Sequence, residues 1–465
     1  MTKSFPNKNH FLVAALPVLA FVRFMSTSFL NNVNYSTPVQ DAITAWGFAD
    51  EGSYLQAGNA LYESGSLEGW HWVVNLWSPG NVFLNSITIS LSEIVHLPFL
   101  LVRFILLLPL VITLSILTLN LLKKAEGWSH LLSNFVPAML VVWVAFGPLF
   151  PKADAPALLA LSIALYVPAI TSLSRIQRVI FFSLALAVAV YFRARYIYLS
   201  HFFALLALIT GAGYFAARYR SSYQRLDMSV RRTRTTTVGK YNAKIFVGSS
   251  LLIFALMSPW LLLNERRDPD RNSDVGLGLS WQVADQVMAP PQILPPAKQP
   301  DFIEEYSGDV FCRFEPTLCQ VVNSYEEQMS APFSIYDNDG FSNEEMRHLV
   351  LGAVASNFSG VTVYKISTIW NIIRTDKSLF GSSLMMTLVV ATWALMNLRA
   401  LFYIWRDGRY RFNPLSTALA LYVLTSTIYA SYLGHIEPRY LLPILMVWPI
   451  HYCQSRSSPD RPVIL

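Results

Sequence analysis

The chain has 465 residues, of which 53% are hydrophobic and only 14% are charged. About 25% charged residues is usual for a soluble domain, so this composition excludes an ordinary soluble protein and indicates that the lipid bilayer is the main solvent. The formal net charge is +6, but the basic residues stand in short blocks beside apolar runs. That placement indicates topology determinants and excludes nucleic acid as the expected partner.

Ten apolar runs are candidates for membrane-spanning helices, because a hydrocarbon core of about 30 Å requires about 20 apolar residues per helix. We therefore expect an all-α polytopic membrane protein with about ten transmembrane helices. The first run is kept as an anchor rather than a cleaved signal peptide, since it lacks a clear cleavage site and Arg23 interrupts it. The runs cover residues 11–30, 99–122, 131–150, 154–173, 179–195, 196–217, 245–263, 380–402, 413–433 and 440–453.

Lysine and arginine cluster after alternate runs, and the positive-inside rule assigns those segments to the cytoplasm. The segment 31–98 contains neither Lys nor Arg and is therefore expected on the opposite side. Both termini are then cytoplasmic, and the expected location is a plasma membrane such as the bacterial inner membrane, with the functional side external. The basic segments are Lys123 and Lys124, Arg175 and Arg178, residues 218–244, and Arg406, Arg409 and Arg411.

This topology divides the chain into three expected parts. A transmembrane module of residues 1–263 includes the first external loop, residues 264–379 form a small extracytoplasmic cap, and residues 380–465 supply the C-terminal transmembrane helices. The cap contains Cys312 and Cys319, which an oxidising compartment would join in a local disulfide. A metal site there is disfavoured, because no His or second Cys pair lies close by in the sequence.

The first external loop carries an acidic pair, Asp50 and Glu51, followed by Tyr54 and by apolar residues at helical spacing. This pattern predicts a short amphipathic helix that lies along the membrane surface. Two interpretations of Asp50 stay open: an ordinary helix N-cap, which is common for Asp, or a catalytic carboxylate.

More charged residues are expected at the same side of the membrane. Lys152 and Asp154 lie between the third and fourth runs, and Arg193 and Arg195 lie between the fifth and sixth. Ionisable groups at this depth are costly and are usually paired or functional, although an arginine can also extend to the lipid phosphates.

The last external turn contains His435, Glu437 and Arg439 within five residues. These residues fit either a simple ion-pair network or a part of a site. Because the topology places all four clusters on one side, the second interpretation gains weight. Carboxylates beside guanidinium groups suit a site that binds phosphate and deprotonates a hydroxyl group.

The motifs resemble those of membrane glycosyltransferases of the GT-C fold, in particular protein O-mannosyltransferases and the bacterial transferases that add aminoarabinose to lipid A. The family has an Asp-Glu pair followed by Tyr in the first external loop, an acidic residue opening the fourth span and a Glu-x-Arg-Tyr-x-x-Pro ending. Basic residues also lie where the family often has one, although the usual flanking Pro is absent. The matching residues are Asp50, Glu51, Tyr54, Asp154, Arg193, Arg195, Glu437, Arg439, Tyr440 and Pro443.

The resemblance implies inverting transfer of a sugar from a polyprenyl-phosphate carrier to a hydroxyl group of a lipid, glycan or protein. Asp50 would be the general base. Basic residues would stabilise the leaving lipid phosphate, and the other substrate-binding residues would position the sugar, the acceptor or those cations. A divalent metal could sit where carboxylates meet phosphate, but no dedicated ligand set is visible, so no cofactor is assigned. The basic residues are Arg193, Arg195 and Arg439, helped by Lys152, and the others are Glu51, Tyr54, Asp154, His435 and Glu437.

A transporter or flippase for a lipid-linked or anionic substrate is the main alternative, since intramembrane Arg and Asp also mark translocation pathways. That function predicts polar residues throughout the depth of the spans and repeat symmetry between halves. The charges here stay at one face, which favours the enzyme. A scaffold with the same fold, whose cap binds a partner, is a third interpretation.

Overall fold

The structure is a computed structural model that describes most of residues 8–267, some residues between 369 and 391, and residues 414–433. All regular structure in this part of the chain is helical. By its contacts the chain divides into two compact units, of which the first comprises residues 1–267, 391–423 and 443–465. The fold and the candidate site are described within this first unit.

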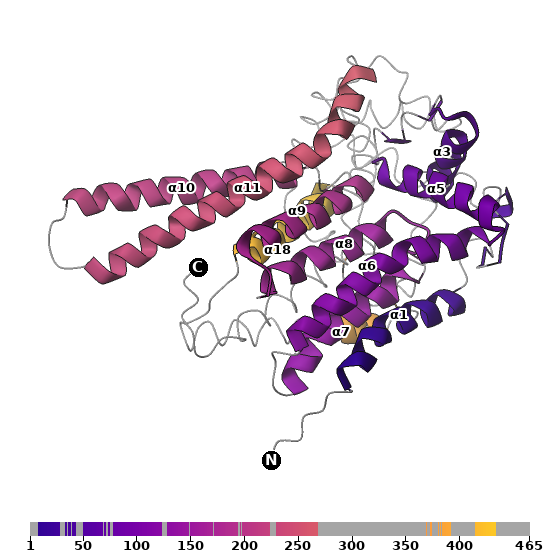
Figure 1. Cartoon of the computed structure of the whole chain (residues 1–465), viewed down its shortest axis with the longest axis horizontal. Coiled ribbons are helices and arrows are strands. Elements are labelled where there is room, and N and C mark those ends of the chain that lie inside the picture. Colours follow the sequence, from indigo (N-terminus) through magenta and orange to yellow (C-terminus); the bar gives the residue numbers. More distant parts are fainter. Residues whose placement is uncertain are drawn as a thin grey trace, which may run out of the picture. The chain divides into compact units, whose positions relative to one another are not determined.

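Its helices follow one another in the order shown in Figure 1. They are α1 (Lys8–Ser26), α3 (Asp50–Ser64), α5 (Gly80–Val95), α6 (Phe99–Leu122), α7 (Trp128–Ala145), α8 (Asp154–Tyr166) with the 3-10 turn η2 (Val167–Ala169), α9 (Arg175–Phe192), α10 (Leu199–Tyr223), α11 (Ser229–Arg267) and α18 (Pro414–Leu433), whose second half belongs to the other unit.

Four of these helices are long and apolar enough to cross a membrane, as predicted for a membrane protein. They cover Phe99–Leu122, Arg175–Phe192, Leu199–Ala216 and Asn242–Leu262. Four shorter apolar helices cover Ala14–Ser26, Phe135–Ala145, Asp154–Ala169 and Leu415–Ile428, so eight predicted runs are apolar helices. The predicted run 380–402 is described only in part, with residues 384–391 helical, and the run 440–453, the cap 264–379 and its Cys312–Cys319 disulfide lie wholly or almost wholly outside the described residues.

An aromatic cluster fixes α1, α6 and the end of α7 to one another. Phe24 stacks on Phe104 with ring centroids 5.0 Å apart, and Phe146 stacks on Phe150 at 5.4 Å. Edge contacts of Phe24 with Phe150 and of Phe104 with Phe146 close the group. Because such rings bury large apolar areas, the cluster supports residues 146–153, called here the α7–α8 turn.

Helix α8 is the buried centre of the first unit, since every one of its side chains is buried. A helix that is apolar all round is expected inside other helices or lipid. Helix α9 packs beside it (Figure 1). The start of α9 is fixed by a capping box in which the Ser174 hydroxyl accepts from the Gln177 N–H, while the Gln177 side chain accepts from the Ser174 N–H.

The predicted helix in the first external loop is present as α3. It ends at Gly65, whose φ of +67° suits glycine and whose N–H bonds to the Leu61 carbonyl at 3.0 Å. Helix α3 packs closely on α5, since a Cβ added at Gly58 would lie 2.6 Å from the Cβ of Asn85. The Tyr62 hydroxyl also donates to Glu93 of α5, a hydrogen bond that raises the pKa of Tyr62.

Helix α5 buries most of its polar side chains and exposes several large apolar ones. Its buried side carries four polar residues at helical spacing, called here the polar stripe, together with Val82 and Ile89, while Phe83, Ile87 and Ile94 are exposed, the last by 70%. The polar stripe contacts Arg103, the fifth residue of α6, which lies about 6 Å along that helix from its start. Its members are Asn81, Asn85, Thr88 and Ser92.

We expect this outer face of α5 to lie against lipid acyl chains, because interfacial helices insert by about 5–10 Å. A nitroxide spin label is attached at Ile87 or Ile94 in a chain whose own cysteines are replaced. Its spin relaxation should be accelerated by dissolved oxygen, and the label should be shielded from a water-soluble nickel chelate. Glu63, exposed on α3, is the matched control and should be open to the chelate. Equal nickel access at Ile87, Ile94 and Glu63 would contradict this prediction.

Gly80, the first residue of α5, is packed against the end of α9. A Cβ at this position would lie 2.5 Å from the carbonyl oxygen of Tyr191, a backbone atom that cannot rotate away. We therefore expect Gly80→Ala to lower the free energy of unfolding by about 1–3 kcal/mol, as overpacking does. Gly211→Ala in α10 is the control, because nothing lies within 4 Å of an added Cβ there. Thermal unfolding in detergent micelles tests the pair, and equal midpoints for the two variants would refute the close contact.

Candidate functional site

The α7–α8 turn and the start of α8 carry two of the predicted site residues, Lys152 and Asp154. Successive backbone bonds shape it, with the Phe150 N–H bonding to the Gly147 carbonyl at 2.9 Å and the Lys152 N–H to the Leu149 carbonyl at 2.8 Å. Helix α8 then begins at Asp154. This tight backbone presents both side chains within three residues.

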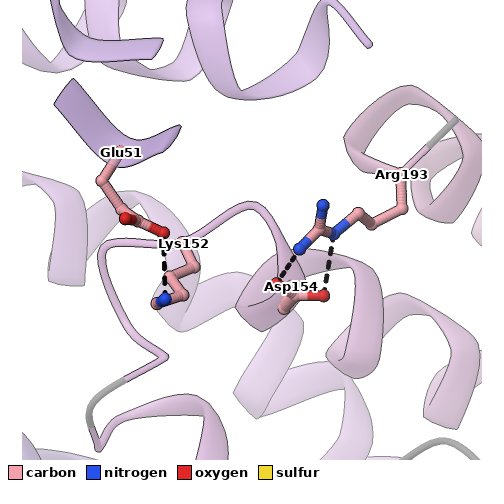
Figure 2. A network of polar contacts seen from close by, with 4 residues as sticks. All are labelled: Glu51, Lys152, Asp154 and Arg193. Carbon is pink, nitrogen blue, oxygen red and sulfur yellow. Dashed lines mark hydrogen bonds and ion pairs between the residues drawn. The ribbon is translucent and has the colours of Figure 1, made fainter. Parts of the chain in front are cut away.

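Asp154 and Arg193 form a buried two-point ion pair, shown in Figure 2. The Arg193 Nε donates to Asp154 Oδ1 at 2.8 Å, and its Nη2 donates to Oδ2. The Asp154 side chain is 5% exposed and that of Arg193 13%. Such paired bonds between a guanidinium and a carboxylate are among the stronger hydrogen bonds in proteins. They join the start of α8 to the end of α9.

The helix ends favour both charges of this pair. Asp154 lies in the first turn of α8, where the partial positive charge of the helix N-terminus stabilises a carboxylate. Arg193 directly follows α9, and its own N–H bonds to the carbonyls of Ala189 and Val190. A cation at a helix C-terminus is stabilised in the same way. The local electrostatics therefore support an ionised pair.

Glu51 and Lys152 form a second ion pair beside the first (Figure 2). Lys152 Nζ lies 3.3 Å from Glu51 Oε1, and the side chains are 31% and 9% exposed, respectively. Glu51 belongs to the first turn of α3, so this pair ties α3 to the α7–α8 turn. The Lys152 side chain is therefore more exposed than those of Glu51, Asp154 and Arg193.

The structure thus brings together four of the predicted site residues, Glu51, Lys152, Asp154 and Arg193. Tyr54, one helical turn after Glu51, is also buried. Asp50 is the first residue of α3 and adjoins Glu51, but its side chain lies outside the described part of the structure. Arg195, His435, Glu437 and Arg439 are outside it as well, so their place in the site remains a prediction.

One functional candidate was missed by the sequence analysis: Arg103, which is fully buried beneath the α7–α8 turn. A signal was available, because Arg103 is the only charged residue of the 24-residue apolar helix α6. An ionisable residue inside an apolar run is by itself a candidate functional residue.

Alternating carboxylates and cations in a largely buried place can hold an anionic substrate and accept a proton from a neutral one. Among the described residues, no group of three His, Cys, Asp or Glu side chains is placed to hold a metal ion. The comparisons with known proteins give no match: no family model, no curated protein and no solved structure matches this chain.

We expect Asp154→Asn to be strongly destabilising, because it removes the carboxylate that faces a buried guanidinium. Loss of one partner of a buried ion pair costs about 3–5 kcal/mol. Adding Arg193→Met should recover part of this loss, since the double variant buries no unpaired charge. Thermal unfolding in lipid nanodiscs measures both variants.

Glu51→Gln is the matched control, because its partner Lys152 is more exposed and solvent can compensate the charge. Its effect should stay near 1 kcal/mol or below. Equal losses for Asp154→Asn and Glu51→Gln, or simple additivity in the double variant, would refute a buried, coupled pair.

Proposed function

We propose that this chain is a membrane glycosyltransferase that moves a sugar from a polyprenyl-phosphate carrier to a hydroxyl acceptor. The observation that carries the proposal is the meeting of two carboxylate–cation pairs, Glu51–Lys152 and Asp154–Arg193, which come from α3, the α7–α8 turn, the start of α8 and the residue that follows α9. The motifs that resemble those of GT-C transferases include three of these four residues, Glu51, Asp154 and Arg193.

The chemistry of such a transfer needs both kinds of group. The acceptor hydroxyl oxygen forms a bond with the anomeric carbon and loses its proton to a carboxylate, for which Asp50 is proposed. The bond between the anomeric carbon and the phosphate oxygen breaks, and its electron pair leaves with the lipid phosphate. Lys152 and Arg193 would stabilise that growing negative charge.

The ion pairs hold Lys152 and Arg193 in place before the reaction begins. A cation already held in place need not reorganise as charge develops, which is the main advantage of a preorganised site. Asp154 fixes both the position and the orientation of the Arg193 guanidinium. Lys152 is held by Glu51 but is 31% exposed, so its ammonium group can turn to a bound phosphate.

The position of the site along the helices supports a lipid-linked donor. The Asp154–Arg193 pair lies after the end of α9, at the opposite end of that helix from Arg175 and Arg178. If the basic end faces the cytoplasm, as the positive-inside rule requires, the site faces the other side. Nucleotide sugars are confined to the cytoplasm, whereas a polyprenyl-phosphate sugar could enter sideways from the bilayer.

The test is sugar transfer from radiolabelled polyprenyl-phosphate sugars by the full chain in nanodiscs. Asp50→Asn should lower kcat by a hundredfold or more, the usual contribution of a general base. Lys152→Met should lower it by about tenfold or more through weaker stabilisation of the leaving phosphate. Glu63→Gln is the matched control, because Glu63 is exposed on α3, the helix that begins with Asp50, and it should leave transfer unchanged.

The outcomes separate the candidate functions. Unchanged transfer by Asp50→Asn would remove Asp50 from catalysis. No transfer by the wild-type chain from any donor, with movement of the lipid-linked sugar across the membrane of sealed vesicles, would replace the transferase by the transporter. Absence of both activities would favour the scaffold.

A further inference from the structure

Arg103 is the largest of the fully buried side chains in the described part of the protein, with only 1% of its surface exposed. Its guanidinium makes three hydrogen bonds. Nη1 donates to Asn85 Oδ1 at 2.5 Å, Nη2 donates to Asn81 Oδ1 at 2.6 Å, and Nε donates to the Phe150 carbonyl oxygen at 3.3 Å. The Phe150 ring also lies 6.0 Å from the guanidinium.

These partners make an unusual environment for a buried cation. Within the described residues, each hydrogen-bond partner of Arg103 is a neutral oxygen and none is a carboxylate. Neutral acceptors compensate the lost hydration of a guanidinium less completely than an ion pair does. A leucine in this place of α6 would avoid that cost, so the arginine needs another explanation than packing.

The three partners belong to two elements, the α7–α8 turn and α5, which are called here the two supports of the Glu51–Lys152 pair. Phe150 belongs to the α7–α8 turn, two residues before Lys152 and four before Asp154. Asn85 belongs to α5, and its Cβ lies against Gly58 of α3, the helix that carries Glu51. One guanidinium therefore links the backbone that presents Lys152 with the helix that supports Glu51.

We propose that Arg103 is a positioning residue, whose three hydrogen bonds fix the α7–α8 turn relative to α5 and thereby align Lys152 with Glu51. The placement follows from the geometry alone, and its consequence for catalysis rests on the proposed function. Lysine cannot replace Arg103, because a single ammonium on a flexible stem does not match three acceptors that lie around a planar guanidinium.

The chain offers a matched control in Arg23. This arginine of α1 also donates its Nε to a backbone carbonyl, that of Trp143 in α7 at 3.4 Å, and its guanidinium lies 4.4 Å from the centre of the Trp143 ring. Arg23 is partly buried, and its guanidinium lies beside Gly147 of the α7–α8 turn. Among the described residues its contacts are with Trp143 of α7 and Gly147 of the α7–α8 turn and not with α3 or α5, so Arg23→Lys disturbs an arginine beside the turn while leaving the bonds of Arg103 to α5 in place.

The first experiment does not depend on activity. The full chain in nanodiscs is treated with a limiting amount of an amine-acylating reagent, and the labelling rate of Lys152 is measured by mass spectrometry against exposed Lys244 as the internal reference. We expect Arg103→Lys to raise the relative rate of Lys152 at least threefold, because the ammonium is released from Glu51. Arg23→Lys should leave the rate unchanged.

Asn85→Ala provides a milder second variant, since it keeps the Cβ that contacts Gly58 and removes one acceptor of Arg103. It should change Lys152 labelling in the same direction as Arg103→Lys and keeps the test decisive if the latter does not fold. An unchanged Lys152 rate in Asn85→Ala and in any folded Arg103→Lys, or an equal rise in Arg23→Lys, would overturn the proposal.

The second experiment uses the transferase assay and a double-mutant cycle. Arg103→Lys should lower kcat at least tenfold, and its effect should be largely lost when Lys152 is already Met, because coupled residues are not additive. Additive effects would show that Arg103 does not act through Lys152. Faster Lys152 labelling without any transfer by the wild-type chain would keep the positioning role and remove the proposed function.

Discussion

The rest of the first unit depends on the pairing of charges at the ends of apolar helices. Asp154 and Arg193 come from α8 and α9, which run beside each other, and the pair joins the ends of these helices that lie far from their connecting turn. Breaking the pair would leave charge where water cannot easily compensate it. The helix dipoles stabilise both partners, so secondary structure and ion pair favour the same arrangement.

The same constraint explains why α5 has its polar face inside. A buried guanidinium at Arg103 requires acceptors, and the polar stripe supplies two of them through Asn81 and Asn85. Because that stripe lies in the protein interior, the opposite side of α5 faces outward, and lipid is the compatible neighbour for its exposed Phe83, Ile87 and Ile94. The aromatic cluster completes the support with a contact that carries no charge. Polar bonds therefore select the orientation of the helices, and ring packing fills the space between them.

Much of the helical architecture could be predicted from the sequence, because apolar runs and helix-breaking residues are local signals. The bounds of α6 were predicted without error, and α3 followed from its apolar spacing before Gly65. Helix α5 was not predicted, since its polar stripe interrupts the apolar pattern by which spans are recognised. Two of its buried asparagines accept hydrogen bonds from Arg103, a residue of another helix, and no local pattern contains that information.

The site was predicted as a group of residues but not as pairs. The motifs and the expected topology predicted Glu51, Lys152, Asp154 and Arg193 on one side of the membrane. In the structure these four residues form two ion pairs. Which carboxylate faces which cation could not be predicted, because Asp154 and Arg193 are 39 residues apart and their contact depends on the packing of α8 against α9. The role of Arg103 was missed for the same reason, since its acceptors belong to α5 and to a backbone carbonyl.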